Sequence, residues 1–197
     1  GGGGGGGAIL YASEFQIPRG LYTFIVGRGG DNDENGYGSE AFNTIASGGM
    51  KGNQVSYYPE MMRTNWYGGE GGVAINNSSF EFEMYNGGIG GTGTWGAEDI
   101  IHPLDGTEGQ VINIIGDYHW GGGGGGGGWY ANFGSGGNGG GGGGGFQNNG
   151  YFGPAYGGAG INGGVTNYGG STQDPTTVGS DGGELTGGGG GGAYSLN

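Results

Sequence analysis

Residues 119–130 read HWGGGGGGGGWY, so eight consecutive glycines separate Trp120 from Trp129. Such a run is either a flexible tether or a built part of the fold. Further runs of seven, seven and six glycines occupy 1–7, 139–145 and 187–192. A tether does not need matched lengths, whereas an element that crosses a layer of fixed thickness does. At about 3.1 Å per residue in an extended threefold helix, each run spans roughly 20–25 Å.

An extended threefold helix of this kind, the polyglycine II helix, makes no internal hydrogen bonds. A buried one must therefore direct its N–H and C=O groups sideways to neighbouring chains. Only a residue without Cβ lets backbones approach from all sides. Ordering a residue costs at least ~1–2 kcal/mol and a hydrogen bond returns ~0.5–1.5 kcal/mol. We therefore expect one isolated run to be disordered and a bundle, sealed by aromatic side chains, to be rigid.

The composition excludes collagen and leaves two interpretations, a disordered chain or a folded domain. Glycine accounts for 65 of 197 residues, but it falls in blocks and the chain has only 5 prolines, whereas collagen needs a strict three-residue period with abundant proline. A glycine-rich chain with net charge −13 is typical of disorder. Aromatic residues make up 13% of the chain and cluster beside the glycine runs, which favours a folded domain.

Charge and cysteine usage exclude several classes of protein and partner. The absence of cysteine excludes disulfides and thiolate metal sites. Four basic residues against 17 acids argue against binding to nucleic acid or an anionic membrane. No apolar run reaches about 18 residues, so we expect no membrane insertion. The chain begins on Gly1 without an apolar leader, which indicates a processed product or a fragment of a longer protein.

The segments between the glycine runs have the composition of β-strands. Residues 8–17 and 21–27 are rich in Ile, Leu, Tyr, Phe and Val, and Pro18-Arg19-Gly20 between them predicts a hairpin. Apolar residues alternate with acids or tyrosine over 80–85, which predicts a strand with one apolar face. Further strands are expected within 39–49, 53–59 and 109–120, the last as a single strand. No segment shows a 3.6-residue apolar period, so we expect almost no α-helix.

The opening GGGGGGGAILYASEFQIPRGLYTFIVGRGG, the loop DNDENGYG and the segment SEAFNTIASGG resemble the glycine-rich domain of phage tail fibres, viral surface proteins and other extracellular proteins. The glycine-rich region of anaplastic lymphoma kinase type receptors is similar, apart from its cysteines. The resemblance implies an all-β fold: an antiparallel, tumour-necrosis-factor-like β-sandwich of hairpins combined with packed polyglycine II helices. We expect one domain over 1–197, mainly strands over 1–120 and mainly polyglycine II over 121–197.

The chain departs from that family at its two ends. Members carry a hydrophobic strand before the first glycine run and another after the last, and neither is present in this sequence. Either the sequence is part of a longer chain, or strands from neighbouring subunits fill the empty edges.

An acidic loop carries the sharpest chemical motif. Oxygen-bearing residues recur at alternate positions, with a glycine at the sixth, as in calcium loops of the EF-hand type: Asp31, Asp33, Asn35, Tyr37 through its carbonyl, and Ser39. The twelfth position is Phe42 instead of the expected glutamate. A solvated acidic hairpin loop is the alternative interpretation. Calcium is the one cofactor that the sequence suggests.

Catalytic motifs are absent from the sequence. His102 and His119 lie in different segments, and no nucleophile elbow, zinc-protease or phosphate-loop signature occurs. The pairs Asp105/Glu108 and Glu81/Glu83 resemble glycosidase carboxylates only in spacing, and acids in strands and turns are usually solvated. We therefore expect a protein that is not an enzyme.

Two mechanical functions fit this composition. The first is a structural subunit of an extracellular or virion appendage, which assembles with copies of itself. The second is an adhesin on a phage or virus that binds a host-surface glycan or protein through aromatic-rich loops. The residues suited to stacking on sugars, or else to sealing the edge of a glycine-rich core, are Tyr57, Tyr58, Trp66, Tyr67 and Trp95. Overlapping sequons permit N-glycosylation at Asn76 and Asn77 in a secretory eukaryote, although a chance match fits as well.

Overall fold

The structure is a computed structural model that describes most of the first 144 residues and parts of the remainder. The described residues are 2–31, 33–58, 63–95, 105–113, 116–127, 134–144, 158, 181–183 and 186–192. Within these ranges the chain contains ten short strands and no helix. The all-β character predicted from the sequence is therefore confirmed for the described part.

The strands form four small antiparallel sheets. Two of them have two strands each: β1 (Ile9–Tyr11) with β7 (Glu83–Tyr85), and β9 (Gln110–Asn113) with β10 (Asp117–Trp120). The third has the order β2 (Ser39–Ala41), β3 (Thr44–Ala46) and β6 (Ala74–Asn76). The fourth has the order β4 (Asn53–Tyr58), β5 (Arg63–Tyr67) and β8 (Gly93–Trp95).

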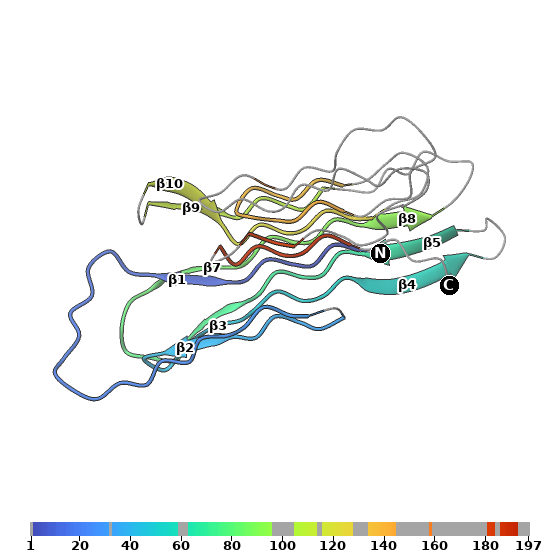
Figure 1. The fold of residues 1–197 in the computed structure, drawn as a ribbon. Helices are drawn as coiled ribbons and strands as arrows, with labels where there is room; N and C mark the ends of the chain where they lie inside the picture. Colours follow the sequence, from blue (N-terminus) through green and yellow to red (C-terminus); the bar gives the residue numbers. More distant parts are fainter. Residues whose placement is uncertain are drawn as a thin grey trace.

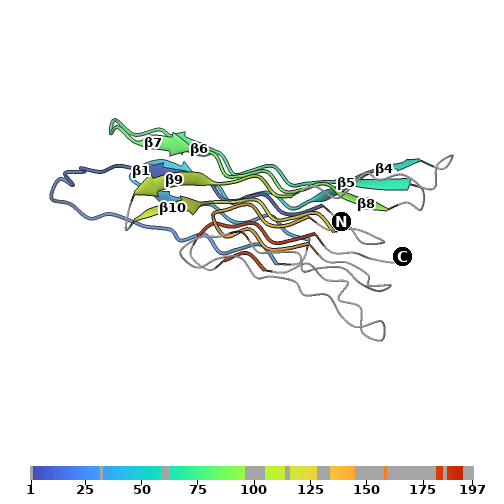
Figure 2. The same cartoon turned by 90° about the horizontal axis from the view of Figure 1, so that it is seen from above.

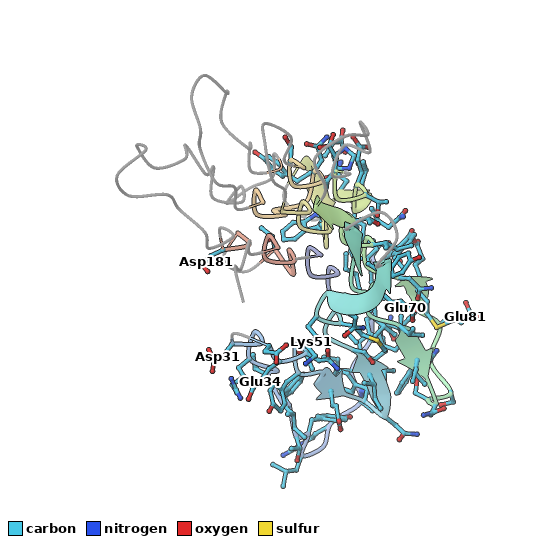
Figure 3. The ribbon with its side chains drawn as sticks, turned by 90° about the vertical axis from the view of Figure 1, so that its right-hand side faces the viewer. Asp31, Glu34, Lys51, Glu70, Glu81 and Asp181 are labelled. Carbon is cyan, nitrogen blue, oxygen red and sulfur yellow. The ribbon has the colours of Figure 1, made fainter. Side chains whose placement is uncertain are left out.

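The sheets lie at the two ends of an elongated molecule. The sheet of β4, β5 and β8 lies at one end, and the other three lie at the opposite end (Figures 1 and 2). Between the ends the chain crosses the molecule repeatedly in extended segments that are not strands. These glycine-rich segments are 2–7, 47–52, 68–72, 86–92, 105–109, 121–127, 134–137, 139–144 and 186–192. Seen from the end in Figure 3, several of them appear as small coils packed side by side.

The hydrogen bonds of segment 2–7 rotate among its neighbours with a period of three residues. The N–H groups of residues 3 and 6 donate hydrogen bonds to segment 86–92, and those of residues 4 and 7 donate to segment 186–192. The N–H groups of residues 5 and 8 donate to the carbonyls of Met50 and Ser47. The donor to acceptor distances are 2.6–2.9 Å. A β-strand alternates between two sides, so this threefold rotation distinguishes the segment from a strand.

Segment 121–127 is the most enclosed of the described segments, and all of its residues are buried. The N–H groups of residues 121–125 are donated to other segments, and the C=O groups of residues 121–126 accept from other segments. Burial of backbone polar groups is tolerated because each of these has a partner. Within the described chain, those partners lie in six segments, namely 2–7, 86–92, 105–109, 134–137, 139–144 and 186–192.

The spacing around segment 121–127 leaves no room for side chains at residues 122–126. A Cβ on Gly124 would lie 2.0 Å from the carbonyl oxygen of Gly190, and a Cβ on Gly123 would lie 2.1 Å from that of Ile89. Residues 122, 125 and 126 meet a carbonyl oxygen at 2.0–2.4 Å in the same way. Backbone therefore fills the interior that side chains fill in most domains.

The large apolar cluster in the described chain is a group of aromatic rings beside β2, β3 and β7. Its rings are Phe15, Tyr22, Phe24, Phe42, Phe80 and Phe82, with neighbouring centroids 4.8–6.4 Å apart. Phe42 contacts four of the others from a turn in which both Phe42 (φ 50°) and Asn43 (φ 59°) are left-handed. Two consecutive left-handed residues form the turn of a two-residue β-hairpin, and Phe is rare at such a position. Among the described hydrophobic side chains only Ile112 is fully buried.

Two sequence predictions about hairpins are wrong. Residues 8–17 and 21–27 do not pair around Pro18-Arg19-Gly20, because β1 pairs with β7 instead and the second segment lies beside β2. Residues 109–120 form the two strands of a hairpin instead of one strand. Gly116 at φ 140° in its turn has a conformation that residues with a Cβ rarely adopt. The strands predicted within 39–49 and 53–59 are present, the former as the hairpin of β2 and β3.

Substitution of Gly124 by alanine tests whether the enclosed segment tolerates a side chain. The new methyl group has only rigid backbone around it, so we expect Gly124→Ala to lower the free energy of unfolding by about 1–3 kcal/mol or more. Gly7→Ala is the matched control, since its Cβ meets nothing closer than 3.6 Å. It should be neutral or stabilise the fold by about 0.4–1 kcal/mol. Urea unfolding measures both, and equal effects would contradict the described packing.

Candidate functional site

An apolar extended segment lies exposed along the outer edge of β2. Residues 21–26 read LYTFIV, and we call them the exposed strand. Leu21 is fully exposed, Val26 is 87% exposed, Phe24 61% and Ile25 51%. A run of this composition is typical of a paired strand in the interior of a sheet. Its exposure is therefore the most unusual feature of the described surface.

The exposed strand is attached to β2 at a single residue pair. Ile25 donates its N–H to the Glu40 carbonyl and accepts the Glu40 N–H, both at 2.9 Å. Within the described chain, no backbone hydrogen bond involves residues 21–24 or 26. Backbone groups of an extended chain alternate in direction, so those of residues 22, 24 and 26 point away from β2. The strand therefore presents an unpaired edge.

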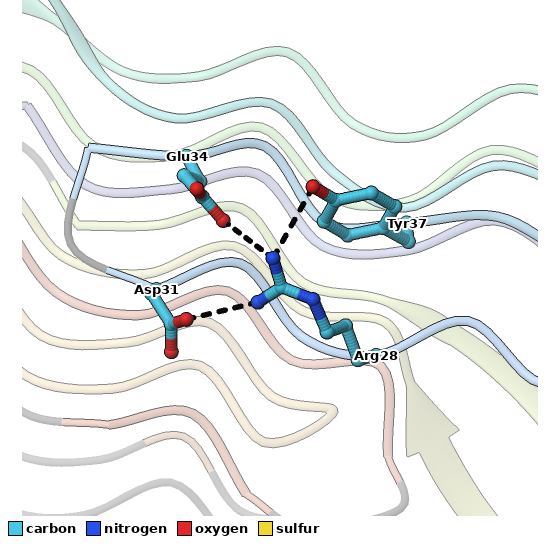
Figure 4. Close-up of polar contacts among 4 residues, drawn as sticks. All are labelled: Arg28, Asp31, Glu34 and Tyr37. Atoms are coloured by element: carbon cyan, nitrogen blue, oxygen red, sulfur yellow. Dashed lines mark hydrogen bonds and ion pairs between the residues drawn. The ribbon is translucent and has the colours of Figure 1, made fainter.

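A loop beside the exposed strand is organised around Arg28, as Figure 4 shows. The guanidinium donates to Asp31 at 2.9 Å, to Glu34 at 2.8 Å and to the Tyr37 hydroxyl at 3.2 Å. It also lies 4.4 Å from the centre of the Tyr37 ring. The hydrogen bond to Glu34, and then that to Tyr37, raise the pKa of Arg28. One cation thus holds both sides of the loop together.

A second cation attaches the same loop to the glycine-rich segments. Lys51 Nζ donates to Asp33 at 2.9 Å, and the Lys51 N–H donates to the Asn35 side-chain oxygen at 2.9 Å. Gly36 donates its N–H to the Gly49 carbonyl at 2.9 Å. In Figure 3 the labelled Lys51 lies beside Asp31 and Glu34, on the side of the loop that faces the rest of the molecule.

The residues predicted to bind calcium lie in this loop but face different partners. Asp31 and the Tyr37 hydroxyl face Arg28, and Asp33 and Asn35 face Lys51. Ser39 Oγ accepts the N–H of Gly27 at 3.0 Å. In the described ranges no three acidic, histidine or cysteine side chains form a group suited to a metal ion. Calcium binding through this loop stays a prediction.

The five aromatic residues predicted to bind a ligand all belong to one sheet. Tyr57 and Tyr58 lie in β4, Trp66 and Tyr67 in β5, and Trp95 in β8. The register places Tyr57 beside Thr64 and Thr64 beside Trp95, so these positions form one row across the sheet. Tyr67 is 46% exposed. The other four side chains lie outside the described atoms.

The two sequon asparagines differ in their surroundings. Asn76 is half-buried, and its side chain donates to the Phe80 carbonyl at 2.8 Å and accepts from Ser78. Asn77 is exposed, and its backbone pairs with Asn43. Of the two, Asn77 has the more accessible side chain. Glycosylation at either residue stays a prediction.

The carboxylates considered for catalysis make local hydrogen bonds. Asp105 accepts the Ser135 N–H at 2.6 Å, and Glu108 accepts from the Asn138 side chain at 2.9 Å, so both attach segment 105–109 to its neighbour. Glu83 accepts from the Tyr85 hydroxyl, which raises the pKa of Tyr85. Glu81 is exposed.

Of the two histidines, which the sequence places in different segments, only His119 lies among the described residues. His119 Nδ1 lies 3.1 Å from the Gly109 carbonyl oxygen. His102 lies outside the described residues.

The described part of the chain contains no helix with the length and apolar character that crossing a membrane requires.

The sequence predictions included the glycine run 1–7 but missed the glycine-rich segments 47–52, 68–72, 86–92 and 105–109, although a signal for two of them is present. Residues 67–73 read YGGEGGV and residues 86–92 read NGGIGGT, so a larger residue occurs at every third position. The outer positions Glu70, Val73 and Ile89 are exposed. A period of three places one side chain per turn on the outer face of a threefold segment.

Comparison with models of known protein families, with curated protein sequences and with solved structures gives no match. The resemblance to the glycine-rich domain family therefore stays a prediction from the sequence.

The Arg28 network predicts a measurable change in loop dynamics. Arg28→Met removes all three donor contacts, so the amides of Glu34 and Tyr37, which bond to the carbonyls of Asp31 and Arg28, should exchange hydrogen faster. Arg28→Lys keeps the charge without the planar fork and should give an intermediate rate. The amide of Gly124 serves as an internal control. Unchanged loop exchange in Arg28→Met would show that the network does not order the loop.

Proposed function

We propose that this chain is a non-enzymatic structural subunit of an extracellular or virion appendage, built by assembly of identical copies. In this proposal the glycine-rich segments are packed polyglycine II helices that form a rigid body. The observation that carries it is the three-residue rotation of hydrogen bonds around segment 2–7, together with the complete pairing of residues 121–125. A tether would leave those groups to water.

Rigidity follows from how the segments depend on one another. Many hydrogen bonds in the interior join segments distant in the sequence, as Gly124 to Gly4 at 2.8 Å and Gly192 to Gly125 at 2.8 Å illustrate. Displacing any one of these segments would break hydrogen bonds to several others. A layer of this kind transmits load without disulfides or a large apolar core, which suits a fibre or shaft.

The finer fold proposed is a tumour-necrosis-factor-like β-sandwich at the end that carries β1, β2, β3, β6 and β7. Figure 1 places the β1–β7 sheet near the β2–β3–β6 sheet at this end. Phe15 supports the arrangement, because its ring contacts Phe42 after β2 and Phe80 and Phe82 before β7. Aromatic packing between two sheets is what a sandwich core requires.

Assembly is supported by the unpaired edge of the exposed strand and by the charge of the chain. Unprotected strand edges recruit strands from other chains. A net charge of −13 would keep the outside of an assembly soluble and limit lateral clumping. Acids such as Glu70 and Glu81 lie on the opposite side of the molecule from the Asp31 loop in Figure 3.

Electron microscopy and light scattering of the natural protein test this function. We expect regular oligomers or fibres, and hydrogen exchange throughout 121–127 should be slow because the backbone groups are paired. A persistent monomer at high concentration would contradict assembly. Fast exchange throughout 121–127 would contradict the packed helices.

An adhesin is the second candidate, and one observation favours it. The five aromatic positions predicted for ligand binding fall in the single sheet of β4, β5 and β8, at the end of the molecule away from the exposed strand. Under this hypothesis the sheet binds a glycan or protein of a host surface.

Binding to host cells or a glycan array tests the adhesin. Trp66→Ala and Trp95→Ala should each reduce binding at least tenfold if the sheet is the binding surface. Tyr118→Ala in β10, at the opposite end, is the control and should leave binding unchanged. Binding that survives both tryptophan substitutions would exclude this sheet as the receptor site.

A further inference from the structure

We infer that the exposed strand pairs with the exposed strand of a second copy of this chain, antiparallel and across a twofold axis at Phe24. The inference rests on the proposed assembly and deepens it, because it names the contact and its register. The pairing would join the sheet order β6-β3-β2-exposed strand of one copy to the same order, reversed, in the other. One continuous sheet then runs through both copies.

The direction of the backbone groups restricts the register. The N–H and C=O of Ile25 are both hydrogen-bonded to Glu40. The backbone N–H and C=O groups available to a partner strand therefore belong to Tyr22, Phe24 and Val26. A symmetric pair can have its twofold axis on any of residues 22–26, and only an axis on Phe24 places all three of these residues opposite one another.

Local sequence also disfavours an axis on Tyr22 or on Val26. An axis at Tyr22 would place Val26 opposite Pro18, which has no N–H to donate. An axis at Val26 would place Phe24 opposite Arg28, whose carbonyl already accepts from Tyr37 at 3.0 Å. With the axis at Phe24, Tyr22 lies opposite Val26 and apolar residues face one another along the contact.

Charge explains why a second copy of so acidic a chain can approach at this edge. Residues 20–27 carry no charge, and Arg19 and Arg28, two of only four basic residues, flank them. Arg19 makes no ion pair in the part of the chain described here. The chain bends at residues 19–20, just before the exposed strand, and in the Phe24 register Leu21 lies opposite Gly27 of the other copy, which brings Arg19 towards the Asp31 loop of that copy. The Asp31 side chain is 83% exposed and accessible to a second cation.

The contact also covers the most exposed apolar side chains of this end. Val26 at 87% exposure and Phe24 at 61% lie on the strand itself, and Leu21 at 100% lies at its start. The neutral apolar edge is complementary to itself, and the flanking Arg19 is complementary to the acidic loop of the other copy. A membrane surface or an acidic protein would match the arginines but would leave the strand edge unpaired.

Cysteine cross-linking of the full chain tests the register directly, since the natural sequence contains no cysteine. Two variants are prepared, Tyr22→Cys and Val26→Cys. Opposite residues of a hydrogen-bonded antiparallel pair have Cα atoms about 5.5 Å apart, within the range of a disulfide. In either variant alone the two cysteines lie four residues apart along the contact, about 13 Å at the rise of a strand, which a disulfide cannot span.

Under mild oxidation we expect the equimolar mixture to form mostly mixed dimers and each variant alone to stay largely unlinked. Val26→Pro, which removes an N–H that bonds to nothing in the described chain, should reduce dimerisation at least tenfold while the thermal midpoint of the monomer stays unchanged. Particles or fibres that form without mixed cross-links would overturn the strand contact and leave the proposed function standing. Equal cross-linking of all three samples would also overturn it. Cross-linked dimers that never grow further would support the contact and contradict the proposed appendage.

Discussion

The absence of Cβ along the interior segments is the constraint on which the rest of the structure depends. Carbonyl oxygens of neighbouring segments lie where side chains would otherwise be, 2.0 Å from the ideal Cβ of Gly124 and 1.9 Å from that of Gly106. This proximity allows each segment to bond with neighbours on more than two sides, which strands in a sheet cannot do. The glycine content is therefore a packing requirement of the interior.

The architecture follows from that requirement. The chain crosses the molecule in glycine-rich segments and forms short strands where it reverses, so the side chains collect at the ends and on the outer faces. The aromatic cluster around Phe42 covers one end, and Ile112 is the only described hydrophobic side chain that is fully buried. Stability in such a molecule comes from many backbone hydrogen bonds, each with a small net contribution.

The sequence predicts the general character of the fold better than its pairing. Matched glycine runs predicted crossing elements, and apolar clusters predicted strands without helix, because both signals are local. The hairpin at Pro18-Arg19-Gly20 was wrong because partner choice is not local, and Ile9 lies opposite Tyr85 from a distant part of the chain. Exposure of Phe24 and Val26 could not be predicted either, since their sequence is typical of an interior strand. The acidic loop was found, whereas its partners Arg28 and Lys51 depend on the fold.

Scalar couplings across hydrogen bonds, measured by NMR on labelled protein, test the central claim most directly. The account predicts couplings from the amide nitrogens of residues 3, 4 and 5 to the carbonyl carbons of Gly91, Gly190 and Met50, three different segments in succession. The amide of Gly124 should couple to Gly4 in the same spectrum. Alternation between two segments would indicate ordinary strands. Absence of any coupling, with random-coil shifts through 121–127, would show that the glycine runs are tethers.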